Sequence, residues 1–134
     1  VPNGLIKCDR ALLDESLRLI NHYRSQEGAA NLTRSPLLEE AALRHSYYMA
    51  AEVRALTHER WYEFITEVGY RCSHASHNVA RYIQDPYILI QSLLNSPGHR
   101  HNLLNPRDTE AGLACVIDAN GEYWWVQNFG TPQE

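Results

Sequence analysis

The final third of the chain carries the feature that most constrains the fold. Residues 110–120 (EAGLACVIDAN) alternate between larger apolar and small or polar side chains, and residues 122–130 (EYWWVQNFG) are rich in aromatic residues of high strand propensity. Asn120–Gly121 lies between the two segments, and this dipeptide is a strong signal for a tight hairpin turn. The pattern predicts two antiparallel strands at the end of the chain.

Helical spacing dominates the chain before that hairpin. Apolar residues recur at helical intervals after Asp9, a suitable N-cap, and Gly28 ends the pattern. Ser35 followed by Pro36 is a strong start signal for a second helix. Helices are expected at residues 8–28, 36–56, 58–70 and 85–96 with a short turn at 99–105, and a further strand is expected at 77–83 after a loop at 71–76. Helices first and a hairpin last predict an α+β layered domain, not a parallel βαβ fold.

Length, charge and cysteine content narrow the class of protein. A chain of 134 residues is expected to form one domain, residues 1–134. The net charge of −4, with no basic block, argues against a nucleic-acid partner. No apolar run approaches the ~20 residues that span a bilayer, and no signal peptide is visible. Three cysteines allow one disulfide at most, and Cys72 with Cys115 is one possible pair.

Four short motifs follow one another in a distinctive order. They are LTHE (56–59), HNVA (77–80), SPGHRHNLL (96–104) and YWWVQNFG (123–130). This series resembles the CAP superfamily, which groups cysteine-rich secretory proteins, antigen 5 and plant pathogenesis-related proteins, and within it the small bacterial SCP-like extracellular proteins. The resemblance covers nearly the whole chain. It implies a three-layer α-β-α sandwich around a small, mainly antiparallel sheet, and a cleft lined by histidines and acidic residues.

The resemblance also identifies the cleft histidines. The two family histidines correspond to His58 in LTHE and His99 in SPGHR. The glutamate that the family places between them is replaced by His77. The helix before SPGHR offers no carboxylate where many members have one. By this interpretation the mixed cleft of the family becomes a cleft of three histidines.

Three histidines with an open coordination position form a known zinc arrangement, so the sequence predicts a site for zinc or another divalent transition metal at His58, His77 and His99. A water-filled cleft and a His77 that turns away from it are the alternatives. Glu59, next to His58, is the best substitute for a missing general base. Asn78 and, on the family pattern, Gln127 are expected to line the same cleft.

Other prominent side chains are interpreted as structural. His45 lies on the apolar face of the second helix and is expected to be a packed, hydrogen-bonded core histidine. His101 is expected at the surface or in contact with the neighbouring segment, because it diverges from His99 in a helical turn. Trp124 and Trp125 alternate along the last strand, and both are expected in the core of a sandwich covered on two faces.

Three functions are compatible with these features. We favour a secreted or periplasmic binding module of bacterial origin that takes a divalent metal or a small ligand in its cleft and a lipid or protein partner on its surface. The second is a metal-dependent hydrolase of peptide or ester bonds, which the three histidines favour and the missing carboxylate opposes. The third is a structural or adhesive domain with an inert cleft. Export is implied by the family resemblance.

Overall fold

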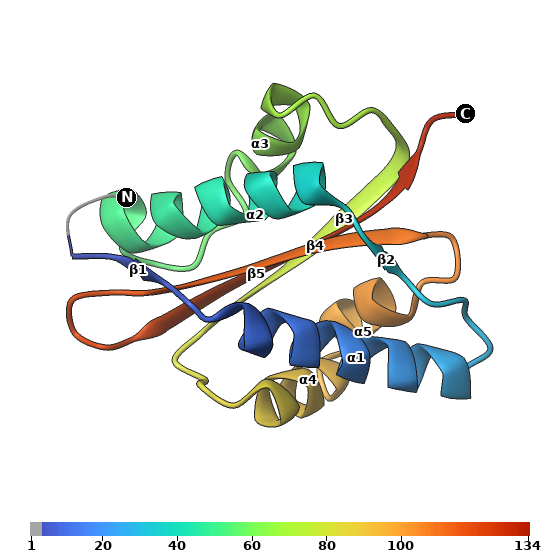
Figure 1. Cartoon of the computed structure of the whole chain (residues 1–134), viewed down its shortest axis with the longest axis horizontal. Coiled ribbons are helices and arrows are strands. Elements are labelled where there is room, and N and C mark those ends of the chain that lie inside the picture. Colours follow the sequence, from blue (N-terminus) through green and yellow to red (C-terminus); the bar gives the residue numbers. More distant parts are fainter. Residues whose placement is uncertain (1–3) are drawn as a thin grey trace.

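The computed structural model describes residues 4–134 and shows helices on both faces of a mainly antiparallel sheet, as Figure 1 illustrates. The helices are α1 (Arg10–Gln26), α2 (Pro36–Tyr47), the π-helix η1 (Tyr48–Val53), α3 (Trp61–Glu67), α4 (Pro86–Leu94) and α5 (Pro97–Leu104). The strands are β1 (Ile6–Lys7), β2 (Thr33–Arg34), β3 (Cys72–Arg81), β4 (Glu110–Ile117) and β5 (Tyr123–Pro132). The expected α+β sandwich is confirmed. Within residues 4–134, no helix is both long and apolar enough to cross a bilayer.

Local start signals explain where two of the helices begin. The Ser35 hydroxyl accepts the backbone N–H of Leu38 at 3.2 Å, which caps α2 as expected. The Asp85 carboxylate accepts the N–H of Tyr87 at 2.9 Å and caps α4 in the same way. Asp9 precedes α1, but its side chain makes no capping hydrogen bond.

The sheet has the order β1-β4-β5-β3, with neighbours antiparallel, and β2 adds a short parallel pairing to β4. The predicted hairpin joins β4 to β5, and its turn is closed by the Gly121 N–H donating to the Asp118 carbonyl at 2.9 Å. β5 then pairs with β3 along most of its length. Strand β3 therefore lies at an edge of the sheet. It carries His77 and Asn78, two of the residues expected to line the cleft.

Two helical layers cover the sheet. Helices α2 and α3 lie on one face, and α1, α4 and α5 lie on the other (Figure 1). Trp124 packs in the α2 layer and Trp125 in the α1–α4–α5 layer, each about 1% exposed, which confirms the expected alternation along β5. At Gly112, in β4, α2 approaches so closely that an added Cβ would stand 2.6 Å from the Leu38 Cβ.

The short strands β1 and β2 were not expected from the sequence, and two longer elements also differ from the expectation. The segment expected as a loop at 71–76 is the first half of β3, which begins at Cys72 and carries a bulge between Cys72 and His74. The helix expected at 36–56 changes to a π-helix at Tyr48 and ends at Arg54, whose φ of 62° is left-handed. The first half of β3 lacks the apolar alternation that marks a strand, because His74 and Ser76 are polar and contact the buried Asp108 carboxylate.

The disulfide joins Cys8 to Cys115, and Cys72 is a free, half-buried thiol. The Cys72–Cys115 pair considered from the sequence is therefore wrong. Strand β5 lies between β3 and β4, which keeps Cys72 away from Cys115. The segment before α1 instead runs along β4, where the Cys8 N–H donates to the Cys115 carbonyl at 3.0 Å.

Candidate functional site

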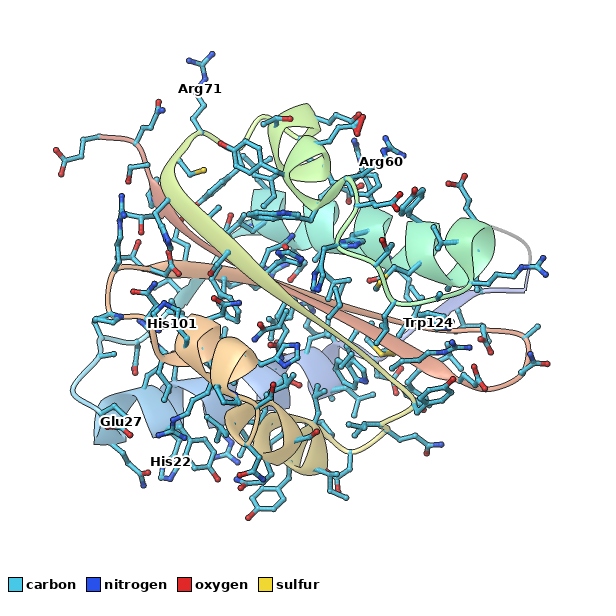
Figure 2. The ribbon with its side chains drawn as sticks, turned by 180° about the vertical axis from the view of Figure 1, so that it is seen from behind. His22, Glu27, Arg60, Arg71, His101 and Trp124 are labelled. Atoms are coloured by element: carbon cyan, nitrogen blue, oxygen red, sulfur yellow. A yellow bond between two sulfur atoms is a disulfide. The ribbon has the colours of Figure 1, made fainter. Side chains whose placement is uncertain are left out.

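Strand β3 presents its polar side chains to both helical layers. In the β3–β5 register His77 pairs with Asn128 and Asn78 pairs with Gln127, and successive side chains of a strand point to opposite faces. His77 accordingly lies against the α2 layer, beside His45. Figure 2 shows the edge strand β3 crossing in front of the other strands, with α5 on one side and the α2–α3 layer on the other.

The rings of His58 and His77 are directly hydrogen-bonded to each other. The Nδ1 of His58 lies 2.7 Å from the Nε2 of His77, so one ring donates an N–H to the lone pair of the other. Trp61, at the start of α3, stacks on the His77 ring with ring centroids 4.3 Å apart and an interplanar angle of 19°. His58 itself is exposed, on the segment that joins η1 to α3. The pair thus joins a packed histidine to one that faces solvent.

The environment of His77 keeps its ring neutral. Burial is the largest of the causes that together lower the pKa of His77 from 6.5 to about 3. Positive charge on His58, His45 or His99 would oppose its protonation as well. A neutral imidazole retains a lone pair, which is the form that binds metal ions.

His45, which the sequence predicts to be a core histidine, lies beside the His58–His77 pair. It is 1% exposed, as expected, and its Nε2 lies 2.8 Å from the Thr57 carbonyl, one residue before His58. Its ring centroid is 6.0 Å from that of His77, and its Nδ1 is buried with no hydrogen-bond partner. Burial is the main cause that lowers the pKa of His45. Its helical spacing predicted the burial, but no local pattern links it to Thr57.

His99 belongs to the other side of β3. It lies in the first turn of α5, where its Nδ1 is 2.8 Å from the Ser96 hydroxyl. Burial, followed by the charge of His58, lowers the pKa of His99. Among residues 4–134, no three His, Cys, Asp or Glu side chains converge in a group that could hold a metal ion. The ligand set of three histidines therefore stays a prediction, and the structure brings together His58 and His77.

A network of amides connects β3 to α5. The Asn102 amide donates to the His77 carbonyl and to the Asn78 Oδ1, both at 3.0 Å. The Asn78 amide donates to the His99 carbonyl at 3.2 Å and to the Gln127 Oε1 at 3.3 Å. Asn78 and Gln127 are each 1% exposed, so this network lies in the interior of the protein.

Glu59 is exposed, and its carboxylate accepts a long hydrogen bond from the Tyr48 hydroxyl at 3.5 Å. It does not join His58 and His77 in a metal-binding group. His101 is exposed on α5, as expected, and is labelled in Figure 2. Neither side chain takes part in the histidine pair.

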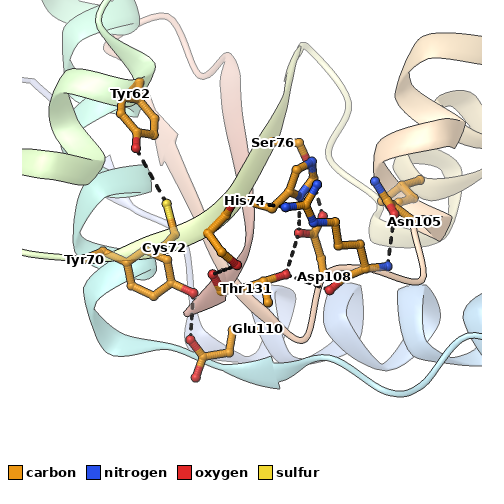
Figure 3. Close-up of polar contacts among 12 residues, drawn as sticks. Tyr62, Tyr70, Cys72, His74, Ser76, Asn105, Asp108, Glu110 and Thr131 are labelled. Carbon is orange, nitrogen blue, oxygen red and sulfur yellow. Dashed lines mark hydrogen bonds and ion pairs between the residues drawn. The ribbon is translucent and has the colours of Figure 1, made fainter. Parts of the chain in front are cut away.

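A separate polar cluster occupies the first half of β3. The His74 Nδ1 lies 2.7 Å from a carboxylate oxygen of Asp108, whose side chain is fully buried. The hydroxyls of Ser76 and Thr131 donate to the same carboxylate at 3.3 Å each, as drawn in Figure 3. These contacts fasten the segment before β4 to β3 and β5. They explain why polar residues expected in a loop form a strand.

Comparisons with known proteins agree on one family. The model of the cysteine-rich secretory protein family (CAP) matches residues 17–129. The uncharacterized protein YkwD of Bacillus subtilis is 26% identical over 118 residues, which are 85% of this chain and 45% of that protein. This chain therefore spans about half the length of that relative.

Solved structures share the fold. An outer surface protein of Borrelia burgdorferi superposes with a TM-score of 0.87 at 20% identity, and the match covers 96% of this chain and 98% of that one. An extracellular protein containing an SCP domain from Bacillus anthracis gives a TM-score of 0.83 at 23% identity, over 92% of this chain and 41% of that one.

Proposed function

The chain belongs to the CAP family, and from this premise we propose that it is an exported binding module whose His58–His77 pair holds a divalent transition metal ion such as zinc. The observation that carries the proposal is the 2.7 Å approach of two imidazole nitrogens. His77 is packed, and its ring stays neutral well below neutral pH. Two imidazole nitrogens that already face each other are a natural donor pair for zinc, copper or nickel.

The donor pair fits such an ion after a small adjustment. With Zn–N bonds of about 2.0–2.1 Å and tetrahedral angles, two ligand nitrogens stand about 3.3 Å apart, so the pair must open by roughly 0.6 Å. His58 is exposed and can supply this movement, while Trp61 and His45 pack against His77. His99 is the proposed third ligand. A metal held by few protein ligands would supply open positions for oxygen or nitrogen atoms of a small ligand.

A binding module is better supported than a hydrolase. Metal-assisted hydrolysis needs a positioned base or a strongly activated water, and the residue suggested for the role of base was Glu59. Its carboxylate has the exposed contact to Tyr48 and is not grouped with the histidines. If the cleft is inert, calorimetric titration will detect no zinc binding.

Export is supported by chemistry and by relatives. The Cys8–Cys115 disulfide is typical of oxidising compartments outside the cytosol. One protein of the same fold is described as extracellular and another as an outer surface protein. The small ligand, lipid or protein that the module recognises, and the bacterial origin of the chain, remain parts of the proposal.

Calorimetric titration of the tag-free, metal-stripped protein with zinc tests the proposal. We expect one site in the wild type and at least about a tenfold loss of affinity, or 1.4 kcal/mol, in His77→Ala, because one of the ligands is removed. His101→Ala is the matched control, since it removes an exposed histidine of α5. His99→Ala separates the ligand sets: a further loss identifies three histidines, and no loss identifies two. Absence of zinc binding, or equal binding by His77→Ala, contradicts the proposal.

A further inference from the structure

We infer that His45 is a positioning residue for the histidine pair: by holding the Thr57 carbonyl, it fixes the exposed segment that turns His58 toward His77. This inference deepens the metal site proposed above and rests on it for its functional consequence. The alignment of the two imidazoles by His45 is inferred from the contacts alone and does not require a bound metal.

The hydrogen bond of His45 fixes the tautomer of its ring. A carbonyl oxygen can only accept, so the ring nitrogen 2.8 Å from Thr57 must carry the proton. The other nitrogen, Nδ1, is then a buried acceptor without a donor in the protein. An unsatisfied buried acceptor of this kind opposes folding unless an ordered water reaches it. Core packing alone would be served at lower cost by an apolar side chain, so the donor to Thr57 is the distinctive property of His45.

The backbone conformation of residues 54–60 requires a stabilising contact such as this hydrogen bond. The segment begins at Arg54 with φ 62° and ends at Arg60 with φ 65°, both left-handed values for long side chains. Residues other than glycine seldom adopt this conformation, so it persists only where surrounding contacts hold it. The π-helix η1 leads into the segment, and short π-helical segments frequently occur at functional sites. Most side chains of the segment are exposed, so core packing contributes little to its conformation.

His45 connects both members of the pair. The centroid of its ring lies 6.0 Å from that of His77, which belongs to the sheet. Its Nε2–H donates to the Thr57 carbonyl, which precedes His58 in the connecting segment. Thr57 and His58 are joined by one peptide, whose α-carbons are about 3.8 Å apart. The peptide that carries the Thr57 carbonyl leads directly into the α-carbon of His58, so release of this peptide is expected to displace the His58 ring. Such a displacement would separate two nitrogens that now lie 2.7 Å apart.

Three variants at one position test the inference. In His45→Gln the side-chain amide reaches the place of Nε2 and can still donate to Thr57. In His45→Asn the amide is one methylene too short, and His45→Leu fills the space without any donor. The readouts are the imidazole ¹⁵N shifts of His58 and His77 in the metal-free protein, which report their hydrogen bond, and the zinc affinity of each variant by calorimetry.

We expect His45→Gln to keep the ¹⁵N signature of the pair and to bind zinc within about threefold of the wild type. His45→Asn and His45→Leu should lose the signature and bind about tenfold more weakly, at the lower end of the range for residues that orient metal ligands. The inference is overturned if folded His45→Asn or His45→Leu keeps the wild-type signature, or if folded His45→Gln loses it. If the wild type binds no zinc, the metal proposal fails while the ¹⁵N comparison still decides the role of His45.

Discussion

The neutral state of His77 predicts that the metal-free protein becomes less stable in acid. In the unfolded chain this ring takes up a proton as the pH falls below 6.5, whereas in the folded protein its pKa is about 3. Between these two values the unfolded state binds more protons, so the free energy of unfolding must decrease as the pH falls. Full stability is retained above pH 6.5 and is lost progressively toward pH 3.

The magnitude follows from the width of that window. At about pH 4.5, two pH units below the unfolded value, one proton contributes at most about 2.7 kcal/mol. The His77 ring is partly exposed, which weakens the cost of charging it, so we expect a loss of roughly 2 kcal/mol from this residue. Burial lowers the pKa of His45 and of His99 as well, and both add to the total slope.

Urea denaturation at about pH 7.5 and about pH 4.5 measures the effect. His77→Gln removes the titrating group while keeping a polar side chain, and its loss of stability between the two pH values should be smaller than that of the wild type by roughly 2 kcal/mol. His101→Gln, which removes an exposed histidine, is the control. Equal losses in the wild type and His77→Gln would refute the reasoning. So would an NMR titration in which the His77 ring is protonated above pH 5.

Two further predictions concern the scaffold that carries the site. Gly112→Ala should destabilise the protein by about 3 kcal/mol in urea denaturation, because its Cβ would overlap the backbone at the start of α2, whereas Gly98→Ala, with nothing within 4 Å, should stay within about 1 kcal/mol of the wild type. Similar stability of the two variants would contradict the close approach of α2 to β4. Removing the disulfide by Cys8→Ala with Cys115→Ala should cost about 4 kcal/mol, since the bridge joins residues 107 apart in the sequence, and Cys72→Ala should cost far less. A loss below about 1 kcal/mol in the double variant would show that the bridge does not constrain the unfolded chain.

Local chemistry explains which parts of the fold the sequence could predict. The capping hydroxyl of Ser35 and the turn at Asn120–Gly121 act over three or four residues, so their signals are complete in the sequence itself. The alternation of Trp124 and Trp125 predicted opposite faces because every strand has a period of two. The family resemblance predicted that His58 and His77 lie in the same cleft, and the structure brings these two rings together.

Contacts between distant segments were beyond such signals. The first half of β3 is polar because His74 and Ser76 meet the buried Asp108 carboxylate, a partner more than thirty residues later in the chain. The pairing of Cys8 with Cys115 depends on strand order, which no cysteine spacing encodes. The hydrogen bond from His45 to the Thr57 carbonyl spans the π-helix η1, and no distinctive residue pattern marks this π-helix in the sequence.

The position of the disulfide has a further consequence for the response of the protein to proteolysis. Cys8 precedes α1 and Cys115 lies in β4, so every connection between the helices is enclosed in one covalent ring. Exposed segments such as residues 54–60 are the usual sites of proteolytic nicking. A single cut there would open the ring without releasing a fragment, because the two pieces stay joined by the bridge and by the sheet. The segment that carries His58 can therefore be exposed to solvent, and even be cleaved, while the molecule remains in one piece.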